Sequence, residues 1–499
     1  MPNPESKIAA ATGLVNDSAL STMANGQPTW RLYGGDELEP LLEHTTVVCA
    51  RWLLKVARGE VLYTDEKGVW LPAGVVPAWQ QLSVEAEVRL DDLRASRWQS
   101  GLPIGVLSYG WASKSHPDPT GSQLRQLAPV LEVILKHCDE APTDEDGESL
   151  GGINAPTFGI VWDYLALPQR GRTAGYNLEG DDRTTNQLAR FRQGLGQINV
   201  WYGHKYTHTL VLNTPMPVGA ENLTPYDRRG WCIFERMISS IVKHFLCYLE
   251  LGKVEGYLEE CRREGHEPRW ALLNMACKAK RPLPMAPDAF EWMLLDKVAK
   301  EAAAPGSGIR FTSGKDLTDV VIPQYESGFL RLFGGTSELV YGELDWGDDD
   351  ATTLAATLAY AVERRVATVA GLDLGSNAIG SRGVRALAPA LAAMPLLETL
   401  TLGDNQIGPE GALALAEAVG TMPRLKELVL EENPLGDKGV AAFARLLEGG
   451  GAPELRTLDL RCTKGSKAEM RMLRACAEKR SIDCDISHDW SQTSCCSVV

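Results

Sequence analysis

The chain has 499 residues, of which 44% are hydrophobic and 23% are charged, a composition typical of folded proteins with buried cores. Its formal net charge of -15 at pH 7 argues against binding to a nucleic-acid backbone, because such proteins carry a basic surface that displaces counterions. The 11 cysteines are scattered without a C-x-x-C pair, so free thiols in a reducing, cytoplasmic compartment are expected rather than a disulfide framework.

The first 100 residues divide into two parts. Residues 1–35 carry no signal-peptide pattern, and we expect them to be disordered. Residues 36–100 predict an extension with a helix over 41–57 and a hairpin around the Asp-Glu-Lys-Gly stretch at 65–68. No apolar run in the sequence approaches the roughly 18 residues of a membrane span.

Residues 101–250 alternate strand-like and helix-like patterns and predict an α/β domain. The expected strands are 104–111, 157–167 and 208–214, and the expected helices are 123–137, 184–203 and 230–251. Strands that alternate with helices favour a parallel sheet with right-handed crossovers and flanking helices.

A ligand site is expected at the carboxyl ends of these strands, where open parallel sheets bind their ligands. Polar and aromatic residues follow the strands there: Ser108, Tyr109, Trp111, Asp163, Tyr164, Gln169, Arg229 and Trp231. Aromatic and polar side chains at one edge of the sheet suit a ligand that has both rings and hydroxyl groups. The arginine could bind a diphosphate through two hydrogen bonds, or could instead oppose Asp227 structurally.

The order of elements over 101–250 resembles a Toll/interleukin-1 receptor (TIR) domain, which has a flavodoxin-like sheet. The first strand ends in Leu107-Ser108-Tyr109, the second in Val161-Trp162-Asp163, and the third helix carries the W-C-x-x-E motif as Trp231-Cys232-Ile233-Phe234-Glu235. The resemblance implies that NAD could be a substrate, with no bound cofactor, and that Glu235 is the catalytic residue. It also implies self-association through this domain.

The alternatives to these site assignments stay open. Glu235 lies near a helix start, where an acid is favoured by the helix dipole alone. The stretch 226–230 replaces a serine-rich stretch of the family, and the loop with His116-Pro117-Asp118-Pro119 is not a usual family feature. Trp231 and Cys232 are residue types that commonly pack in cores. His204 and His208 are four residues apart, but no further ligand completes a set, so no metal is expected.

Residues 251–343 are expected to form a helical extension. One helix is predicted over 288–304, with Asp288 well placed as its N-cap, and another after 312, with Ser313 and Asp316 in a capping-box-like start.

Residues 344–480 contain an internal repeat. Units begin at Leu372, Leu400 and Leu428 with the pattern L-x-L-x-x-N-x-ϕ-G, a degenerate unit precedes them at Leu344, and a capping unit follows at Leu458. The pattern resembles the ribonuclease-inhibitor-like class of leucine-rich repeats. Each unit predicts a short strand and a helix that stack into an α/β solenoid, with the asparagines satisfying backbone groups at each bend.

The residues between the strand leucines are expected on the concave face, where such solenoids bind proteins. The candidate partner-binding residues are Asp373, Thr401, Val429, Glu431, Asp459 and Arg461. Residues 481–499 are expected to be a tail. Its Cys495 and Cys496 fit a loose lipidation pattern that would attach the protein to a membrane, although Val499 is an unusual final residue.

Together these patterns predict a cytoplasmic recognition or signalling protein whose repeats bind a protein partner and whose α/β domain cleaves NAD. The rival hypothesis is a catalytically silent interaction scaffold. A third is an enzyme that acts on another nucleotide.

Overall fold

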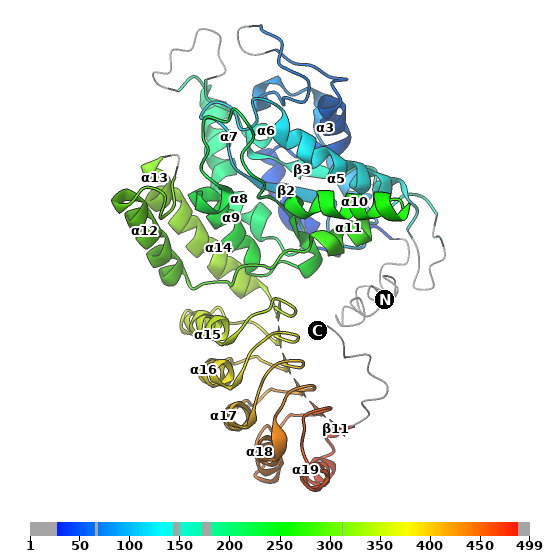
Figure 1. The fold of residues 1–499 in the computed structure, drawn as a ribbon, viewed down its shortest axis with the longest axis vertical. Helices are drawn as coiled ribbons and strands as arrows, with labels where there is room; N and C mark the ends of the chain where they lie inside the picture. The colour runs from blue at the N-terminus through cyan, green and yellow to red at the C-terminus, as the bar shows by residue number, and fades with distance from the viewer. Residues whose placement is uncertain are drawn as a thin grey trace. The chain divides into compact units, whose positions relative to one another are not determined.

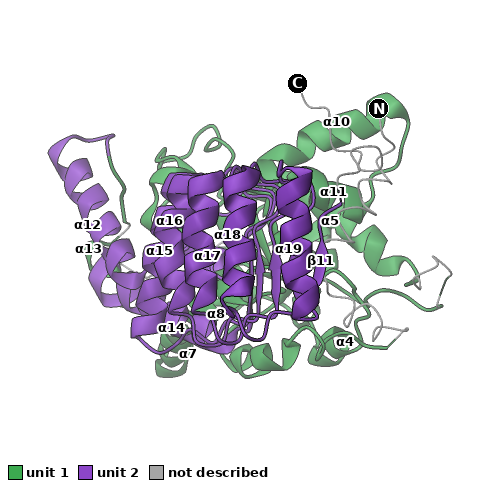
Figure 2. Ribbon diagram, turned by 90° about the horizontal axis from the view of Figure 1, so that it is seen from below, with its two compact units in different colours: residues 1–235, 243–279, 308–316 green, residues 236–242, 280–307, 317–499 purple. Residues whose placement is uncertain are grey.

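The computed structural model describes residues 27–64, 68–142, 149, 151–171, 181–311 and 313–487. They divide into two compact units (Figure 2): unit 1 comprises residues up to 235, 243–279 and 308–316, and unit 2 comprises 236–242, 280–307 and the rest from 317. Within the described ranges, no helix is long and apolar enough to cross a membrane.

Unit 1 is built on a sheet in the order β1-β3-β2-β4-β5. Four strands run parallel, namely β3 (Gly159–Val161), β2 (Ile104–Tyr109), β4 (His208–Leu212) and β5 (Tyr248–Glu250). The short β1 (Val48–Cys49) pairs antiparallel to β3. Every residue of β2 and β4 is buried, as expected for central parallel strands covered on both faces. The chain order reverses beside β2, which places a topological switch point at its carboxyl end.

Helices connect or follow the strands of this sheet (Figure 1). They are α3 (Ala50–Ala57), α4 (Leu90–Arg94), α5 (Ser122–Asp139), α6 (Asp163–Ala166), α7 (Thr185–Gly196), α8 (Ile198–Gly203), α9 (Gly230–Ser240), α10 (Val254–Glu264) and α11 (Trp270–Cys277). Asp118 supports the start of α5 by accepting a hydrogen bond from the amide of Leu124 at 2.9 Å. The loop at 116–119 therefore has a clear structural task.

Three predicted elements of this region were too long. The strand predicted over 157–167 ends after β3, because Asp163 begins α6. The helix predicted over 184–203 is broken at Gln197 into α7 and α8. The helix predicted over 230–251 ends at Ser240, and the strand β5 follows. A buried three-residue strand has the same continuous apolar pattern as a buried helix, so periodicity could not separate them.

The extension before the sheet also differs from its prediction. In place of the single helix expected over 41–57, the chain forms a 3-10 helix at Gly35–Glu43, then the strand β1, then α3. The helix is interrupted because the β-branched residues at 45–48 favour extended backbone. Most of the predicted turn, residues 65–67, lies outside the described residues, but Thr64 and Trp70 on either side form an antiparallel bridge.

Unit 2 contains a six-stranded sheet in the order β11-β10-β9-β8-β7-β6. The strands are β6 (Glu338–Val340), β7 (Gly371–Asp373), β8 (Thr399–Thr401), β9 (Glu427–Val429), β10 (Thr457–Asp459) and β11 (Asp483–Asp485). The helices between them stack in sequence (Figure 1): α15 (Asp348–Glu363), α16 (Ser381–Ala392), α17 (Pro409–Gly420), α18 (Gly436–Glu448) and α19 (Lys467–Lys479). The central leucine of each strand from β7 to β10 is buried against these helices.

The predicted role of the repeat asparagines is confirmed. The side-chain oxygen of Asn405 accepts a hydrogen bond from the amide of Ile379 at 2.9 Å. Its amide nitrogen donates to the carbonyls of Leu374, Leu402 and Gly403. Asn377 and Asn433 repeat the pattern in their own units. Each asparagine therefore joins its own strand end to the preceding repeat.

The solenoid is longer at both ends than the predicted range 344–480. The strand before α15 is β6, at Glu338–Val340, and not a strand at Leu344 as predicted, and β11 falls within the predicted tail. Neither edge strand carries the Leu-x-Leu pattern of the repeats, so the sequence pattern did not identify them.

Two helices precede the repeats, α12 (Pro287–Ala303) and α14 (Ile322–Gly335). The prediction that Asp288 is the N-cap of α12 is wrong. Ala286 occupies the N-cap position, and Pro287 is the first residue of the helix. Ser313 precedes the short α13 (Gly314–Asp316) and accepts a hydrogen bond from the amide of Lys315 at 3.3 Å.

Candidate functional site

The carboxyl end of β2 meets the glutamate of α9. Ser108, which is fully buried in β2, donates a hydrogen bond from Oγ to Oε2 of Glu235 at 2.6 Å. The same Oγ lies 2.5 Å from the hydroxyl of Tyr226. The predicted catalytic carboxyl therefore points toward the strand ends.

The environment of Glu235 favours its neutral form. Burial raises the pKa of this carboxyl well above its usual range, and the negative charge of Asp163 acts in the same direction. Hydrogen bonds from Ser108 and Tyr202 act against this shift because they favour the carboxylate. The carboxyl of Glu235 therefore tends to keep its proton, while Ser108 and Tyr202 can stabilise the carboxylate once the proton is lost.

A second carboxyl, Asp163, lies where β3 turns into α6. It accepts hydrogen bonds from the hydroxyl of Tyr109, from Nε1 of Trp111 at 3.0 Å, and from the amide of Tyr164 at 2.6 Å. Burial raises its pKa, although these three donors oppose the shift. Tyr109 and Trp111, two of the predicted ligand residues, are therefore hydrogen-bonded to Asp163.

Aromatic rings form one side of this site. The rings of Trp111 and Tyr164 lie 5.8 Å apart and almost perpendicular, and His116 packs on Tyr164 with ring centres 4.7 Å apart. Tyr164 is buried, whereas Trp111 is half-buried. Trp111 is consequently the better placed of the two for stacking on a ligand ring.

Arg229 is fixed to the backbone around Trp111. Its Nε donates to the carbonyl of Thr224 at 2.8 Å, Nη1 to the carbonyl of Trp111 at 2.8 Å, and Nη2 to the carbonyl of Asn222 at 3.0 Å. A Cβ on Gly110 would lie 2.7 Å from Nε of Arg229, so only glycine leaves room for the guanidinium. Arg229 holds Trp111 in place, and its contact with a diphosphate stays a prediction.

Gln169 and Trp231, two other predicted ligand residues, also have protein partners. The side-chain amide of Gln169 donates to the carbonyls of Leu167 at 2.7 Å and Asp163 at 3.3 Å. Nε1 of Trp231 donates to Asp316 at 3.0 Å. Gln169 thus supports the turn that carries Asp163, and Trp231 anchors the segment before α14.

Two tyrosines at the site were missed by the sequence analysis. Tyr202, at the end of α8, shares its single hydroxyl hydrogen between the carbonyl of Leu107, at 2.8 Å, and the carboxyl of Glu235. Tyr226 contacts Ser108 from the loop before α9. A tyrosine on the apolar face of a predicted helix needs a hydroxyl partner when buried, which was the available signal for Tyr202.

The two histidines considered for metal binding have different surroundings. His204 accepts a hydrogen bond from the amide of Tyr206 at 3.2 Å. His208 is fully buried among the rings of Trp98, Phe158 and Trp270. Over the described part of the chain, no group of three or more His, Cys, Asp or Glu residues is arranged to hold a metal ion.

The predicted partner-binding residues of unit 2 lie on one face of its sheet. Asp373, Thr401, Val429 and Asp459 are in register across β7, β8, β9 and β10. Glu431 and Arg461 form part of the next row, and Nη2 of Arg461 contacts both Glu431 and Asp459. Cys495 and Cys496, the predicted lipidation sites, lie outside the described residues.

Comparison with protein families covers part of this second unit. Residues 372–388, 393–416 and 422–444 match the family described as Leucine Rich repeat. These segments are leucine-rich repeats. A comparison of the whole chain with curated proteins finds no match. Leucine-rich repeat domains in general mediate protein–protein binding, which supports an interaction role for unit 2.

Proposed function

We propose that the leucine-rich repeats bind a protein partner and that unit 1 cleaves NAD between nicotinamide and ribose, with Glu235 as the catalytic residue. The resemblance of Trp231–Glu235 to the W-C-x-x-E motif of TIR domains supports the proposal. The strand order β3-β2-β4-β5 fits the flavodoxin-like arrangement of that family.

The observation that carries the proposal is the hydrogen bond between Ser108 and Glu235. It brings the acid of α9 to the carboxyl end of β2, where ligands of open parallel sheets bind. Asp163, with Tyr109 and Trp111 attached, comes to the same edge from the neighbouring strand. Half-buried Trp111 supplies a ring surface beside these carboxyls.

The chemistry calls for an anion at this place. The nicotinamide ring of NAD already carries a positive charge. It therefore leaves as a neutral molecule, and no acid needs to protonate it. The ribose develops positive charge at its anomeric carbon, and a nearby carboxylate stabilises that charge, as in glycoside hydrolysis. Water then attacks the anomeric carbon and releases one proton. The hydrogen bonds from Ser108 and Tyr202 favour the carboxylate form that this step uses.

The test is NAD consumption by the purified full-length chain. Glu235→Gln keeps the shape and removes the charge, so cleavage should fall by at least about 100-fold, in line with losses of a key stabilising group. Glu259→Gln, an exposed glutamate on α10, is the matched control and should keep full activity. Cleavage that survives Glu235→Gln would refute the catalytic assignment.

The ionisation of Glu235 adds a second readout. Its raised pKa means that the carboxylate forms only as the pH rises through that pKa, so activity should increase with pH across this range. A rate that falls over the same range would show that the neutral acid is the active form.

A non-catalytic scaffold is the second candidate, because a neutral Glu235 can simply tie α9 to β2 through Ser108. On this alternative, wild type and Glu235→Gln are equally inert toward NAD even when the protein is clustered. Thermal stabilisation by one member of a nucleotide panel would instead identify an enzyme for a different nucleotide.

A further inference from the structure

A chain of two buried hydroxyls ends at Glu235. The hydroxyl of Tyr226 lies 2.5 Å from Oγ of Ser108, and that Oγ lies 2.6 Å from Oε2 of Glu235. The three residues come from separate elements, namely the 3-10 helix Tyr226–Arg228, the strand β2 and the helix α9. Ser108 is fully buried, and Tyr226 is nearly so. Buried polar groups need partners within the protein, so each hydroxyl depends on the other members of this chain.

The available hydrogens determine the direction of these bonds. A serine or tyrosine hydroxyl donates one hydrogen and can also accept, whereas an ionised carboxylate only accepts. When Glu235 is ionised, Ser108 gives its hydrogen to Oε2, so the bond between Ser108 and Tyr226 needs the hydrogen of Tyr226. Within the described part of the chain, the hydroxyl of Tyr226 has no other hydrogen-bond partner. Tyr226 therefore donates to Ser108, and Ser108 donates to Glu235.

The same chain can reverse when Glu235 is neutral. A proton on Oε2 is then donated to Oγ of Ser108, and the hydrogen of Ser108 turns toward the hydroxyl of Tyr226, which can accept it. The bonds of the ionised state are stronger, because a charged acceptor makes a hydrogen bond about twice as strong and polarises the bond behind it. The hydroxyl of Tyr226 consequently stabilises the carboxylate more than the neutral acid.

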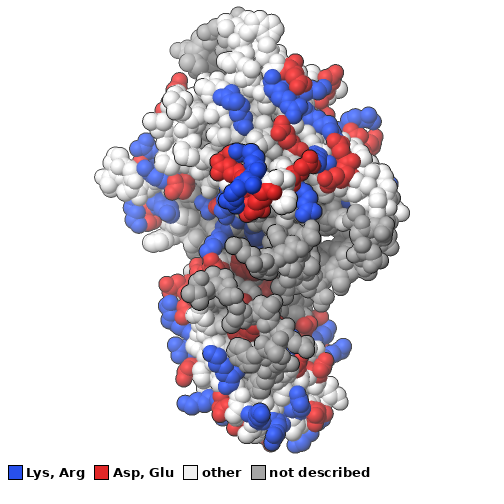
Figure 3. Space-filling model, turned by 45° about the vertical axis from the view of Figure 1, so that its right-hand side comes forward, with Lys and Arg blue, Asp and Glu red and all other residues white. Residues whose placement is uncertain are grey.

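The surroundings of Glu235 make this stabilisation important. On the surface shown in Figure 3, acidic and basic side chains lie close together. The hydrogen bonds of Glu235 come instead from the neutral hydroxyls of Ser108 and Tyr202, and the negative charge of Asp163 opposes its ionisation. The ionisable groups that face the hydroxyl chain are Asp163 at the start of α6, Tyr202 of α8, Cys232 of α9 and Tyr248 of β5.

Packing holds the ring of Tyr226 in place. It belongs to a cluster of buried residues with Val211, Cys232, Tyr248 and Ala279. The amide of Arg229 donates to the carbonyl of Tyr226 at 3.2 Å, just before α9 begins. A phenylalanine at this position would keep the ring in its cluster and would remove the hydroxyl alone.

From this chain of hydrogen bonds, we propose that Tyr226 is a positioning residue for Glu235, which it reaches through Ser108. Its hydroxyl directs the hydrogen of Ser108 toward the carboxylate that the proposed NAD cleavage uses. The inference rests on that proposed function and adds to the site a residue from outside the W-C-x-x-E motif.

The experiment measures kcat/KM for NAD across pH with the full-length chain. Tyr226→Phe should move the acid limb of the profile up by about one pH unit, so the rate on this limb falls about tenfold while the plateau at high pH changes little. Tyr257→Phe is the matched control, because it removes the hydroxyl of another buried tyrosine of unit 1, one that pairs with Arg269. Its profile should coincide with that of wild type. A plateau that falls without movement of the acid limb would show only structural damage and would overturn the inference.

Ser108→Ala tests the route from Tyr226 to Glu235. If Tyr226 acts through Ser108, adding Tyr226→Phe to Ser108→Ala should move the acid limb no further. A further shift as large as that in the wild-type background would show that Tyr226 acts on Glu235 without Ser108, which would overturn the inference.

Thermal unfolding separates this inference from the proposed function. Wild type that cleaves no NAD at any pH would refute the proposed function, and the hydroxyl chain is then tested by stability alone. Glu235→Gln has no ionisable carboxyl, so the pH above which wild type melts below this variant reports the ionisation of Glu235. Tyr226→Phe in both backgrounds should raise this pH by about one unit, and Tyr257→Phe should leave it unchanged. A pH that Tyr226→Phe does not move would overturn the inference whatever the activity.

Discussion

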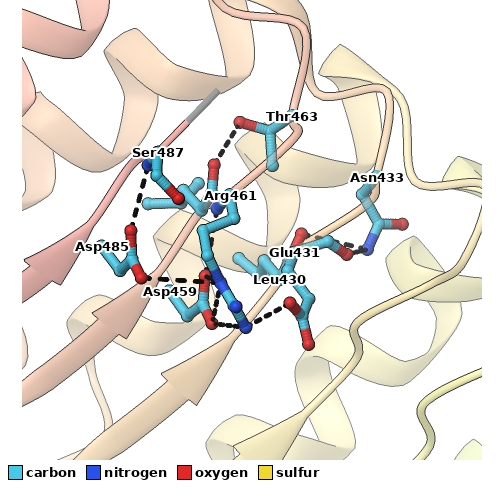
Figure 4. A network of polar contacts seen from close by, with 9 residues as sticks. Leu430, Glu431, Asn433, Asp459, Arg461, Thr463, Asp485 and Ser487 are labelled. Carbon is cyan, nitrogen blue, oxygen red and sulfur yellow. Dashed lines mark hydrogen bonds and ion pairs between the residues drawn. The ribbon is translucent and has the colours of Figure 1, made fainter. Parts of the chain in front are cut away.

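Carboxyl groups gather in both units, but they meet different partners. In unit 1, Glu235 and Asp163 accept hydrogen bonds from neutral groups, a serine, tyrosines and an indole, and burial raises the pKa of both. In unit 2, Asp459 binds the guanidinium of Arg461, and this hydrogen bond raises the pKa of the arginine. The neutral donors of unit 1 bring no positive charge to their carboxyls, whereas Arg461 brings one to the carboxylates around it (Figure 4). The first arrangement suits chemistry and the second suits recognition.

The two sites are also assembled differently along the chain. The residues around Glu235 come from positions as distant as Ser108 and Tyr202, so their meeting depends on the whole sheet. The row of Asp373, Thr401, Val429 and Asp459 arises because one strand position repeats from unit to unit, in register across neighbouring strands. A substitution in the repeats should therefore act on a few stacked neighbours, and one in unit 1 on a shared core.

The largest stability effect is expected from Asn405→Ala in the repeats. Asn405 is buried, and its loss leaves the amide of Ile379 and three carbonyls of two repeats without this partner. Unit 2 should lose about 3 kcal/mol, because buried unsatisfied polar groups cost roughly 1–3 kcal/mol each. Denaturant unfolding monitored for each unit measures the loss. Gln406→Ala, at an exposed neighbour, is the control, and equal stability of the two variants would show that the asparagine ladder contributes little.

Acid should destabilise unit 1 through His208. Burial, together with the charge of Lys243, lowers the pKa of His208 to about 3. Since the unfolded chain titrates near pH 6.5, it binds more protons below that pH, and stability falls as the pH falls. The expected loss is roughly 2 kcal/mol between pH 7 and pH 5.

His208→Phe should remove this pH dependence while it retains the packing with Trp98, Phe158 and Trp270. His266→Gln, at an exposed histidine, should leave it unchanged. Thermal unfolding across this pH range measures both. Parallel losses in wild type and His208→Phe would assign the acid sensitivity to other groups.

Glu235 should give the opposite pH dependence of stability. Its folded pKa is raised, so the folded state binds more protons and the stabilising contribution is lost as pH rises through that pKa. Glu235→Gln carries no such cost, so it should melt above wild type at pH 8, and the gap should close near pH 4. A variant that melts below wild type at pH 8 would show that the carboxylate is well stabilised in the fold.

The repeats could be predicted from sequence because each one carries its own signals. Leu-x-Leu and the asparagine recur at Asn377, Asn405 and Asn433, and each unit contacts its neighbours alone. The edge strands β6 and β11 lack the Leu-x-Leu pattern and were missed. Local patterns identify a repeat but not the places where an array begins and ends.

The site in unit 1 could be predicted only in outline. The strand ends and the W-C-x-x-E motif located Ser108, Asp163 and Glu235, which the structure brings to one edge of the sheet. Tyr202 could not be located in this way, because its contact with Glu235 depends on how α8 packs on the sheet. Nor could the sequence show that Arg229 holds backbone carbonyls, because the geometry of a loop decides what a guanidinium reaches.

Arg461→Gln should have the smallest effect on stability. Arg461 is half-buried with its carboxylates near solvent, and pairs of this kind contribute about 0–1 kcal/mol because water screens them and the side chains lose entropy. Arg445→Gln, on the helix side, is the control of equal charge. Denaturant unfolding of unit 2 measures both variants, and a loss of more than about 2 kcal/mol for Arg461→Gln would make Arg461 a structural residue and would remove the contrast between the two groups of carboxyls.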